Sequence, residues 1–205
     1  NNLNQSTAEQ RLNRIFQSNY EMGSTFKPLT VAMGIEKNLI NKKMEFDVSK
    51  PIKGKINDWD PCNCSLSVKE IIVRSSNIGT AKIAKIIGKK NQINFFKKIG
   101  FYEPVKINLK EAAKPMGQQY HWGEIETMTI GFGHGFAVTP MHLAIAYASI
   151  LNEGNKINPK LILHEKNKIK NKVVSKETSK YFSSLLRSVI QETNFTGPRV
   201  KIEGY

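Results

Sequence analysis

The residues best suited to chemistry in this sequence are a serine and a lysine three positions apart. Ser24 and Lys27 lie in the segment Gly-Ser-Thr-Phe-Lys-Pro at residues 23–28, which opens an apolar stretch. On a helix, residues three apart share one face, with Cβ atoms about 5–6 Å apart. The positive end of the helix dipole and apolar neighbours such as Phe26 both disfavour a protonated lysine. A lysine that is neutral near pH 7 can accept a serine proton, so the pair predicts a nucleophile with its general base.

The Ser24 backbone N–H would face outward at the start of this helix, where it could serve as one donor of an oxyanion hole. Taken alone, Ser-x-x-Lys is a weak pattern, and the ordinary alternative is a capping serine followed by a solvated lysine. Ser24 and Lys27 are the only match to this spacing in the chain, and they begin its most apolar early helix. Both facts favour the catalytic interpretation.

A second polar cluster, Ser75-Ser76-Asn77, lies between two expected helices. Such a turn presents the Ser75 hydroxyl and the Asn77 carboxamide on the same side. The hydroxyl could relay a proton between a lysine and a leaving amine, and the amide could bind a peptide carbonyl and hold the lysine. The alternative is that Ser76 or Asn77 simply caps the helix that follows.

Hydrophobic periodicity predicts that helices dominate the chain. The most apolar is 140–152, with Thr139 as N-cap and Pro140 at its first position, and we expect it to be central and buried. Ser67 is a plausible cap for a short helix, and the helix at 176–192 is amphipathic. The expected helices are 24–37, 67–73, 77–87 (ended by Gly88), 91–99, 140–152 and 176–192. We expect a loop at 103–127 and a hairpin formed by 160–164 and 172–174.

The net charge of +14 arises from 31 Lys and Arg against 17 Asp and Glu. The basic residues are scattered and only five are arginines, the better residue for bidentate phosphate contact. We therefore expect biased residue usage rather than a nucleic-acid partner, while a nonspecific attraction to anionic cell-wall polymers stays open. No apolar run approaches the 18 or more residues of a membrane span.

Cysteines and histidines suggest no cofactor or metal centre. Cys62 and Cys64 have no further ligand pair at fitting spacing, so we interpret them as a loop pair. The four histidines are far apart in sequence; His134 could line a pocket, but loop packing is the simpler role. Residues 131–135 hold three glycines that do not match Gly-x-Gly-x-x-Gly, and we interpret them as permitting tight backbone turns.

In order and spacing, these segments resemble class B penicillin-binding proteins, whose pattern combines Ser-x-x-Lys, a Ser-x-Asn turn and Lys-Thr-Gly. Residues 21–28 (EMGSTFKP) resemble the nucleophile segment of that family, and 74–84 (RSSNIGTAKIA) its second motif with the following helix. Residues 129–140 (TIGFGHGFAVTP) are similar to its glycine-rich loop and central helix. With Trp-Gly-Glu at 122–124, this loop looks most like the septal, division-specific transpeptidases. The resemblance covers nearly the whole chain.

The resemblance implies an α/β (α+β) penicillin-binding-protein and β-lactamase-like fold, of which this chain would be mostly the helical part with an incomplete sheet. It implies that Ser24 is the acylated nucleophile, Lys27 its base, Ser75 a proton shuttle and Asn77 a ligand of the substrate amide. The reaction would be peptidoglycan cross-linking by acyl transfer from D-Ala-D-Ala stem peptides, and β-lactams would acylate the same serine. No cofactor is expected. Division-complex membrane proteins would be partners, at the periplasmic face of a bacterial inner membrane, with the anchor outside this chain.

The chain departs from the family pattern at its third motif. Thr196-Gly197 has no lysine before it, and the resemblance places Lys-Thr-Gly shortly after Tyr205 and the first strands before Asn1. We therefore expect residues 1–205 to be a partial transpeptidase domain, truncated at both ends and poorly active. Three other functions stay open: a β-lactam-sensing receptor domain, a β-lactamase, for which we find no convincing deacylating glutamate, and a non-catalytic interaction module.

Overall fold

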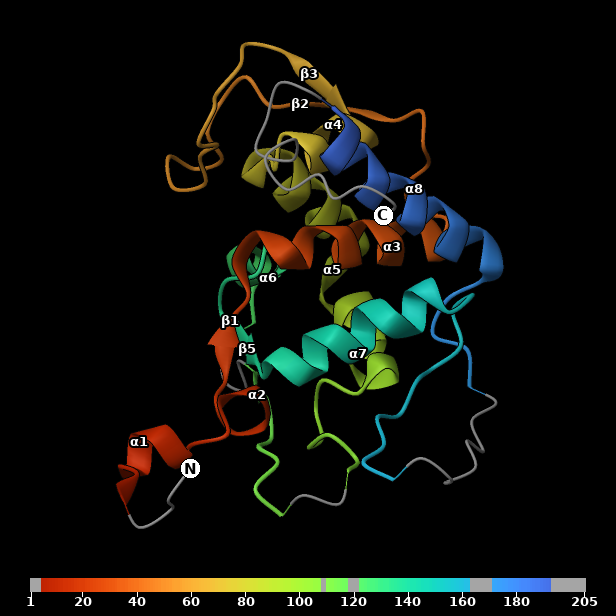
Figure 1. Cartoon of the computed structure of the whole chain (residues 1–205). Coiled ribbons are helices and arrows are strands. Elements are labelled where there is room, and N and C mark those ends of the chain that lie inside the picture. Colours follow the sequence, from red (N-terminus) through yellow and green to blue (C-terminus); the bar gives the residue numbers. More distant parts are fainter. Residues whose placement is uncertain (1–4, 108–109, 118–121, 163–170, 193–205) are drawn as a thin grey trace.

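Helices account for most of the described chain. The structure is a computed structural model that describes residues 5–107, 110–117, 122–162 and 171–192. Its helices are α1 (Ala8–Arg11), α2 (Arg14–Gln17), the 3-10 helix η2 (Gly23–Phe26), α3 (Lys27–Glu36), α4 (Val68–Val73), α5 (Asn77–Ile99), α6 (Glu124–Gly131), α7 (Pro140–Leu151) and α8 (Lys176–Gln191). Figure 1 shows α3 at the centre, and α3 packs against α4, α5 and α8. The helix that follows Ser24 thus contacts three other helices of the fold.

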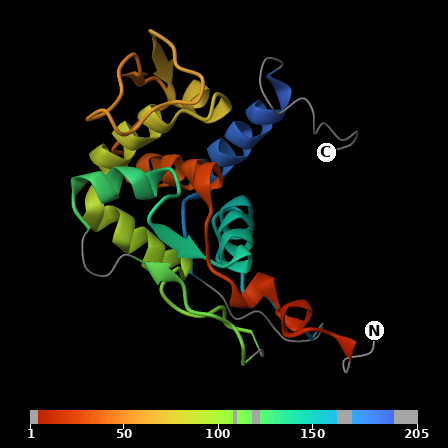
Figure 2. The same cartoon turned by 90° about the vertical axis from the view of Figure 1, so that its left-hand side faces the viewer.

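Two small antiparallel sheets accompany the helices. In the first, β5 (Phe136–Val138) lies between β1 (Tyr20–Glu21) and β4 (Met116–Gly117). In the second, β2 (Glu45–Asp47) pairs with β3 (Ser65–Ser67). Figure 2, a view turned by 90°, shows β5 beside the chain that leads into α3. The fold therefore mixes helices with short, incomplete sheets, as the resemblance implied.

Capping side chains hold the starts of three helices, two of them at the predicted caps, Ser67 and Thr139. Ser67 forms a capping box with Glu70 at the start of α4, and the side chains of Thr139 and Ser175 accept backbone N–H groups at the starts of α7 and α8. The helices expected at 77–87 and 91–99 form the two halves of α5, which Gly88 interrupts with a φ of 75°. Local side-chain chemistry therefore set these boundaries.

The core around α3 is aromatic. Phe26, at the end of η2, is fully buried and contacts Phe96, Phe101 and Phe136, with ring centroids 5.6–6.4 Å apart. Every residue from 26 to 34 is buried. A lysine at position 27 is therefore forced to lie at the edge of an apolar interior.

Three expectations about the secondary structure are wrong. α7 is not buried all round, because its buried residues fall on one side and Leu151 is 46% exposed. The segment expected as a loop at 103–127 contains β4 and the first turn of α6. The expected hairpin is absent from the described part: 160–162 is not a strand, Lys172 forms only an isolated bridge with Asn155, and 163–164 lie outside the described residues.

Candidate active site

Lys27 is buried and points at Ser75. It is the first residue of α3, its exposed fraction is 2%, and its Nζ donates to the carbonyl oxygen and, over 2.9 Å, to the hydroxyl Oγ of Ser75. Burial lowers the pKa of Lys27 from 10.5 to about 8, although the nearby Asp58 carboxylate opposes this shift. The lysine therefore carries a neutral fraction at physiological pH that an ordinary surface lysine lacks.

Ser24 lies one turn before Lys27, on η2. The Ser24 carbonyl accepts the Lys27 backbone N–H, and Ser24 is exposed. In a 3-10 helix, side chains at i and i+3 eclipse each other, so both side chains leave the helix in the same direction. The Ser24 hydroxyl makes no hydrogen bond to another described residue, and it is thus open to a substrate.

Ser75 adopts a backbone conformation that is unusual for a side-chain-bearing residue. Its φ is 55°, and it lies exposed between the end of α4 and the start of α5. A non-glycine residue in the left-handed region persists only where its surroundings fix it, and such residues gather at functional sites. This conformation presents both Ser75 oxygens to Lys27.

The other two residues of this turn have separate roles. Ser76 caps α5, because its Oγ accepts the backbone N–H of Gly79 at 2.9 Å. The Asn77 side-chain Nδ2 donates to the Asn57 carbonyl at 2.8 Å, and no hydrogen bond joins Asn77 to Lys27 in the described part of the chain. The capping alternative is therefore confirmed for Ser76, whereas Ser75 alone of the three binds the lysine.

Sequence reasoning missed Asp58. Its Oδ2 accepts the Ser76 hydroxyl at 2.7 Å, and its Oδ1 accepts the backbone N–H of Ile78 at 2.9 Å. The available signal was the polar segment Asn-Asp-Trp-Asp-Pro at 57–61, which reads as an ordinary turn. Its partners lie 18 and 20 residues away, beyond any local pattern.

The glycine-rich loop packs directly on the segment that carries Ser24. A Cβ at Gly133, whose φ is 89°, would lie 2.1 Å from the Gly23 carbonyl oxygen, and the Gly23 N–H donates to the Gly133 carbonyl at 3.2 Å. The Gly135 N–H donates to a Glu21 carboxylate oxygen at 2.8 Å. Gly133 and Gly135 thus permit tight turns as predicted, whereas Gly131 is the last residue of α6. Gly133 also permits a backbone-to-backbone contact beside the candidate nucleophile. His134 is exposed and its ring lies against Phe132, which fits a loop-packing role.

The two cysteines form a disulfide, Cys62–Cys64. The sequence placed them together in a loop and left open whether they are linked, and the structure joins them. A guanidinium nitrogen of Arg74 lies 3.9 Å from Cys64 Sγ, and another donates to Asp60 at 2.9 Å. No group of three or more His, Cys, Asp and Glu side chains that could hold a metal ion occurs among the described residues.

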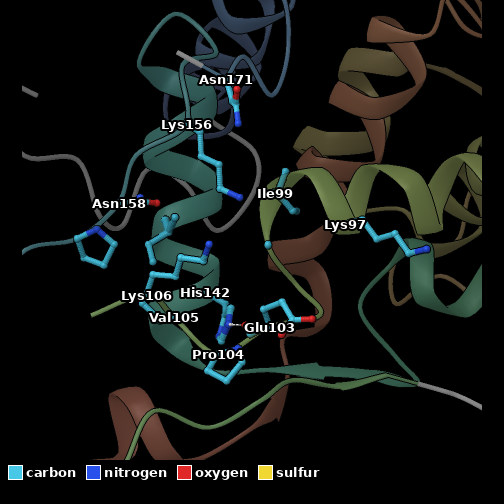
Figure 3. A pocket seen from close by; sticks show the side chains of 13 residues that line it. Lys97, Ile99, Glu103, Pro104, Val105, Lys106, His142, Lys156, Asn158 and Asn171 are labelled. Carbon is cyan, nitrogen blue, oxygen red and sulfur yellow. Dashed lines mark hydrogen bonds between the residues drawn. The ribbon is translucent and has the colours of Figure 1, made fainter. Parts of the chain in front are cut away.

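A cavity of about 310 Å³ lies away from Ser24, between α7, the end of α5 and the loop that follows it. Its lining includes Lys97, Lys106 and Lys156, and Figure 3 shows Lys106 and Lys156 side by side in front of α7. Burial and the charge of Lys106 both lower the pKa of Lys156. Lysines that are scattered in sequence therefore gather here, although none of the candidate catalytic residues lines this cavity.

A comparison with protein families decides the relationship. The sequence model of the penicillin binding protein transpeptidase domain matches residues 1–205. The chain belongs to this family. The class B resemblance read from the sequence is confirmed, since this chain is 37% identical over 152 residues to the probable peptidoglycan D,D-transpeptidase FtsI of Caulobacter vibrioides. That match covers 73% of the chain and 26% of the relative. The peptidoglycan D,D-transpeptidase FtsI of Escherichia coli K12 is 28% identical over 159 residues, 75% of the chain and 26% of the relative.

Solved structures agree on the fold of this chain. The transpeptidase domain of Burkholderia pseudomallei penicillin-binding protein 3 superposes with a TM-score of 0.86 at 26% identity, covering 94% of this chain and 60% of that one. A peptidoglycan glycosyltransferase of Burkholderia ambifaria gives a TM-score of 0.82 at 26% identity, covering 88% and 59%. The α/β fold class is therefore confirmed. The chain spans about a quarter of the length of the first curated relatives, and no helix among the described residues is long and apolar enough to cross a membrane.

Proposed function

We propose that this chain carries the acyl-transfer centre of a peptidoglycan D,D-transpeptidase, with Ser24 as nucleophile, Lys27 as general base, Ser75 as proton shuttle and Asn77 as substrate ligand. The observation that carries the proposal is the buried Lys27, whose amine is bonded to Ser75 one turn beyond the exposed Ser24. Relatives named as D,D-transpeptidases support the reaction class.

The first half-reaction forms an ester on Ser24. Neutral Lys27 accepts the Ser24 hydroxyl proton while the oxygen attacks the carbonyl carbon between the two D-alanines of a stem peptide. The Ser24 backbone N–H, near the start of η2, stabilises the developing oxyanion, since the Gly23 N–H is already bound to the Gly133 carbonyl. The proton then passes from Lys27 through the Ser75 hydroxyl to the departing amine, and the C–N bond breaks to release D-alanine.

The second half-reaction runs through the same groups in reverse. An amine of a neighbouring stem peptide attacks the Ser24 ester, loses its proton through Ser75 to Lys27, and forms the cross-linking amide as Ser24 recovers its hydrogen. A β-lactam ring, whose amide carbonyl takes the place of the D-Ala-D-Ala peptide bond, would open onto Ser24 in the first step and remain as the ester.

In this proposal Asn77 binds the substrate through its carboxamide, since the hydrogen bond to the Asn57 carbonyl uses one Nδ2 hydrogen and leaves the other hydrogen and the carbonyl oxygen. The role in division, the division-complex partners and a site of action at the periplasmic face of the inner membrane rest on the likeness to septal transpeptidases. The view of residues 1–205 as a partial domain rests on the same likeness, and Thr196-Gly197 lies outside the described residues.

Labelling with a fluorescent penicillin tests the proposal. We expect one label per molecule on the peptide that contains Ser24, in the protein as its cell produces it, and much weaker labelling of residues 1–205 alone. Ser24→Ala should abolish labelling, whereas Ser183→Ala, at an exposed serine on α8, should leave it unchanged. Labelling that survives Ser24→Ala would remove the assignment, and efficient labelling of residues 1–205 would refute the expected weakness of that segment.

Turnover separates the remaining alternatives. A transpeptidase joins stem peptides and releases D-alanine, a β-lactam sensor forms a long-lived acyl-enzyme without consuming stem peptides, and a β-lactamase hydrolyses a chromogenic β-lactam rapidly. Release of D-alanine that depends on Ser24 would select the first of these.

A further inference from the structure

The residues that follow β2 include a short loop, residues 57–60, that is attached to both sides of the Ser75 turn. The Asn57 carbonyl accepts from Asn77, Asp58 accepts from Ser76 and Ile78, and Asp60 pairs with Arg74 at 2.9 Å. We propose that Asp58 is a positioning residue for acyl transfer: by clamping the start of α5 it holds Ser75 in the conformation that engages Lys27. The inference rests on the proposed function and adds a residue to it.

The geometry of Asp58 is that of a clamp. Each carboxylate oxygen accepts a different group, one the Ser76 hydroxyl at 2.7 Å and the other the Ile78 N–H at 2.9 Å. The Ile78 N–H belongs to the first turn of α5, where backbone donors lack an intrahelical partner and the dipole favours a negative charge. Hydrogen bonds to a charged acceptor are stronger than those between neutral groups. One side chain thus fixes two successive points of the helix start.

The segment that Asp58 binds directly follows Ser75, whose backbone conformation is unusual for a residue with a side chain. Ser75 has a φ of 55° and immediately precedes Ser76, so a shift of the α5 start would let Ser75 relax to an ordinary conformation. Such a relaxation would turn the Ser75 carbonyl and hydroxyl away from the Lys27 amine, which now donates to both. Proton transfer between Ser24 and a leaving amine would then lose its relay.

Asp58 also acts on Lys27 by its charge. Among the titratable groups around this turn, Arg74 and Asp60 pair with each other, and burial keeps the phenol of Tyr147, which donates to the Thr25 carbonyl, neutral by raising its pKa. The Asp58 carboxylate is the described group whose charge raises the pKa of Lys27 against the effect of burial. Removing the charge therefore makes Lys27 easier to deprotonate, while removing the clamp disorganises the relay, and the two effects are separable.

The pH dependence of acylation separates them. We would measure the second-order rate constant for acylation by a fluorescent penicillin from pH 5.5 to 9.5, in the protein as its cell produces it, for the parent and for Asp58→Asn, Asp58→Ala and Asp60→Asn. Asparagine keeps an acceptor for the Ile78 N–H but loses the charge and the second acceptor. We expect Asp58→Asn to move the midpoint of the profile to lower pH and to reduce the plateau about tenfold, with a larger loss for Asp58→Ala.

Asp60→Asn is the matched control, because it removes the same charge from the same loop without touching Ser76 or Ile78. We expect its midpoint to be unchanged and its rate to stay within about twofold of the parent. A merely structural role of Asp58 would lower the rate and leave the midpoint in place. Equal profiles for Asp58→Asn and the parent, or the same shift in Asp60→Asn, would overturn the inference.

A second readout does not depend on acylation. The Lys27 side chain can be titrated by NMR through its Cε shift in the parent and in Asp58→Asn, with thermal unfolding as a check that both are folded. We expect a lower midpoint in the variant, and an unchanged midpoint overturns the inference even if the protein proves not to react with penicillin. Failure of the parent to label at Ser24 would instead count against the proposed function.

Discussion

Replacing Lys27 with methionine should make the protein more stable while it removes acylation. Methionine has a similar length and no charge to bury. The fall in the lysine pKa from 10.5 to about 8 corresponds to a penalty of about 3 kcal/mol at neutral pH, at ~1.4 kcal/mol per unit. Loss of the hydrogen bonds from Lys27 to Ser75 destabilises the variant by about 1 kcal/mol, and by no more because the exposed Ser75 can bind water instead. The expected net gain is about 2 kcal/mol, or roughly 4–8 °C in Tm for a domain of this size.

The gain should depend on pH in a defined direction. Below pH 8 both the folded and the unfolded protein hold the Lys27 proton, so the parent carries the full penalty. Between about 8 and 10.5 only the unfolded state holds it, and the parent therefore regains stability as the pH rises. Above 10.5 the lysine is neutral in both states and the penalty is gone, so only the lost Ser75 bonds count and the methionine variant should be about 1 kcal/mol less stable than the parent.

Urea unfolding of parent and Lys27→Met at pH 7, 9 and 11 would measure this difference, since titrations shared by both proteins cancel. Lys89→Met, at an exposed site on α5, is the matched control and should change stability by less than about 0.5 kcal/mol at every pH. Equal stabilities of parent and Lys27→Met at pH 7, or a difference that does not vary with pH, would refute a buried, partly neutral lysine.

Two further predictions concern the glycine-rich loop and the lysine-lined cavity. Gly133→Ala should lower stability by at least ~2 kcal/mol and slow acylation, since its methyl would collide with the Gly23 carbonyl at a left-handed backbone position; an unchanged Tm would contradict this close approach. Lys106→Gln should raise the pKa of Lys156, followed by NMR, and stabilise the fold by roughly 0.2–0.5 kcal/mol as a like charge is removed. The same substitution at Lys89 should do neither, and an unmoved Lys156 titration would contradict the repulsion.

The sequence predicted what local chemistry determines. Ser67 and Thr139 cap helices within three residues of themselves, so their effect is visible in the order of residues alone. The pairing of Ser24 with Lys27 is local in the same way, because both lie on one helical turn. Burial of Lys27 could be expected from the apolar residues that follow it.

The remainder of the site depends on contacts between distant segments. Lys27 and Ser75 are 48 residues apart, so the residues alone suggested only that the Ser75 hydroxyl could relay a proton for a lysine, and the resemblance to a known family assigned both to one site. Asp58 carried no such signal, since an aspartate in a polar loop is common and its partners become apparent only when the loop lies against α5. The exposure of one side of α7 was also beyond prediction, because periodicity reports how apolar a helix is and not what covers it.

The Cys62–Cys64 bond has a consequence that follows from its short span. It joins residues two apart and encloses only Asn63, so it takes little freedom from the unfolded chain, equivalent to less than ~2 kcal/mol in the chain-entropy description. Reduction of the disulfide should therefore lower the free energy of unfolding by less than ~2 kcal/mol and should mainly disturb the contact between Cys64 and the neighbouring Arg74. The disulfide constrains one bend of the chain and does not join distant parts of the molecule.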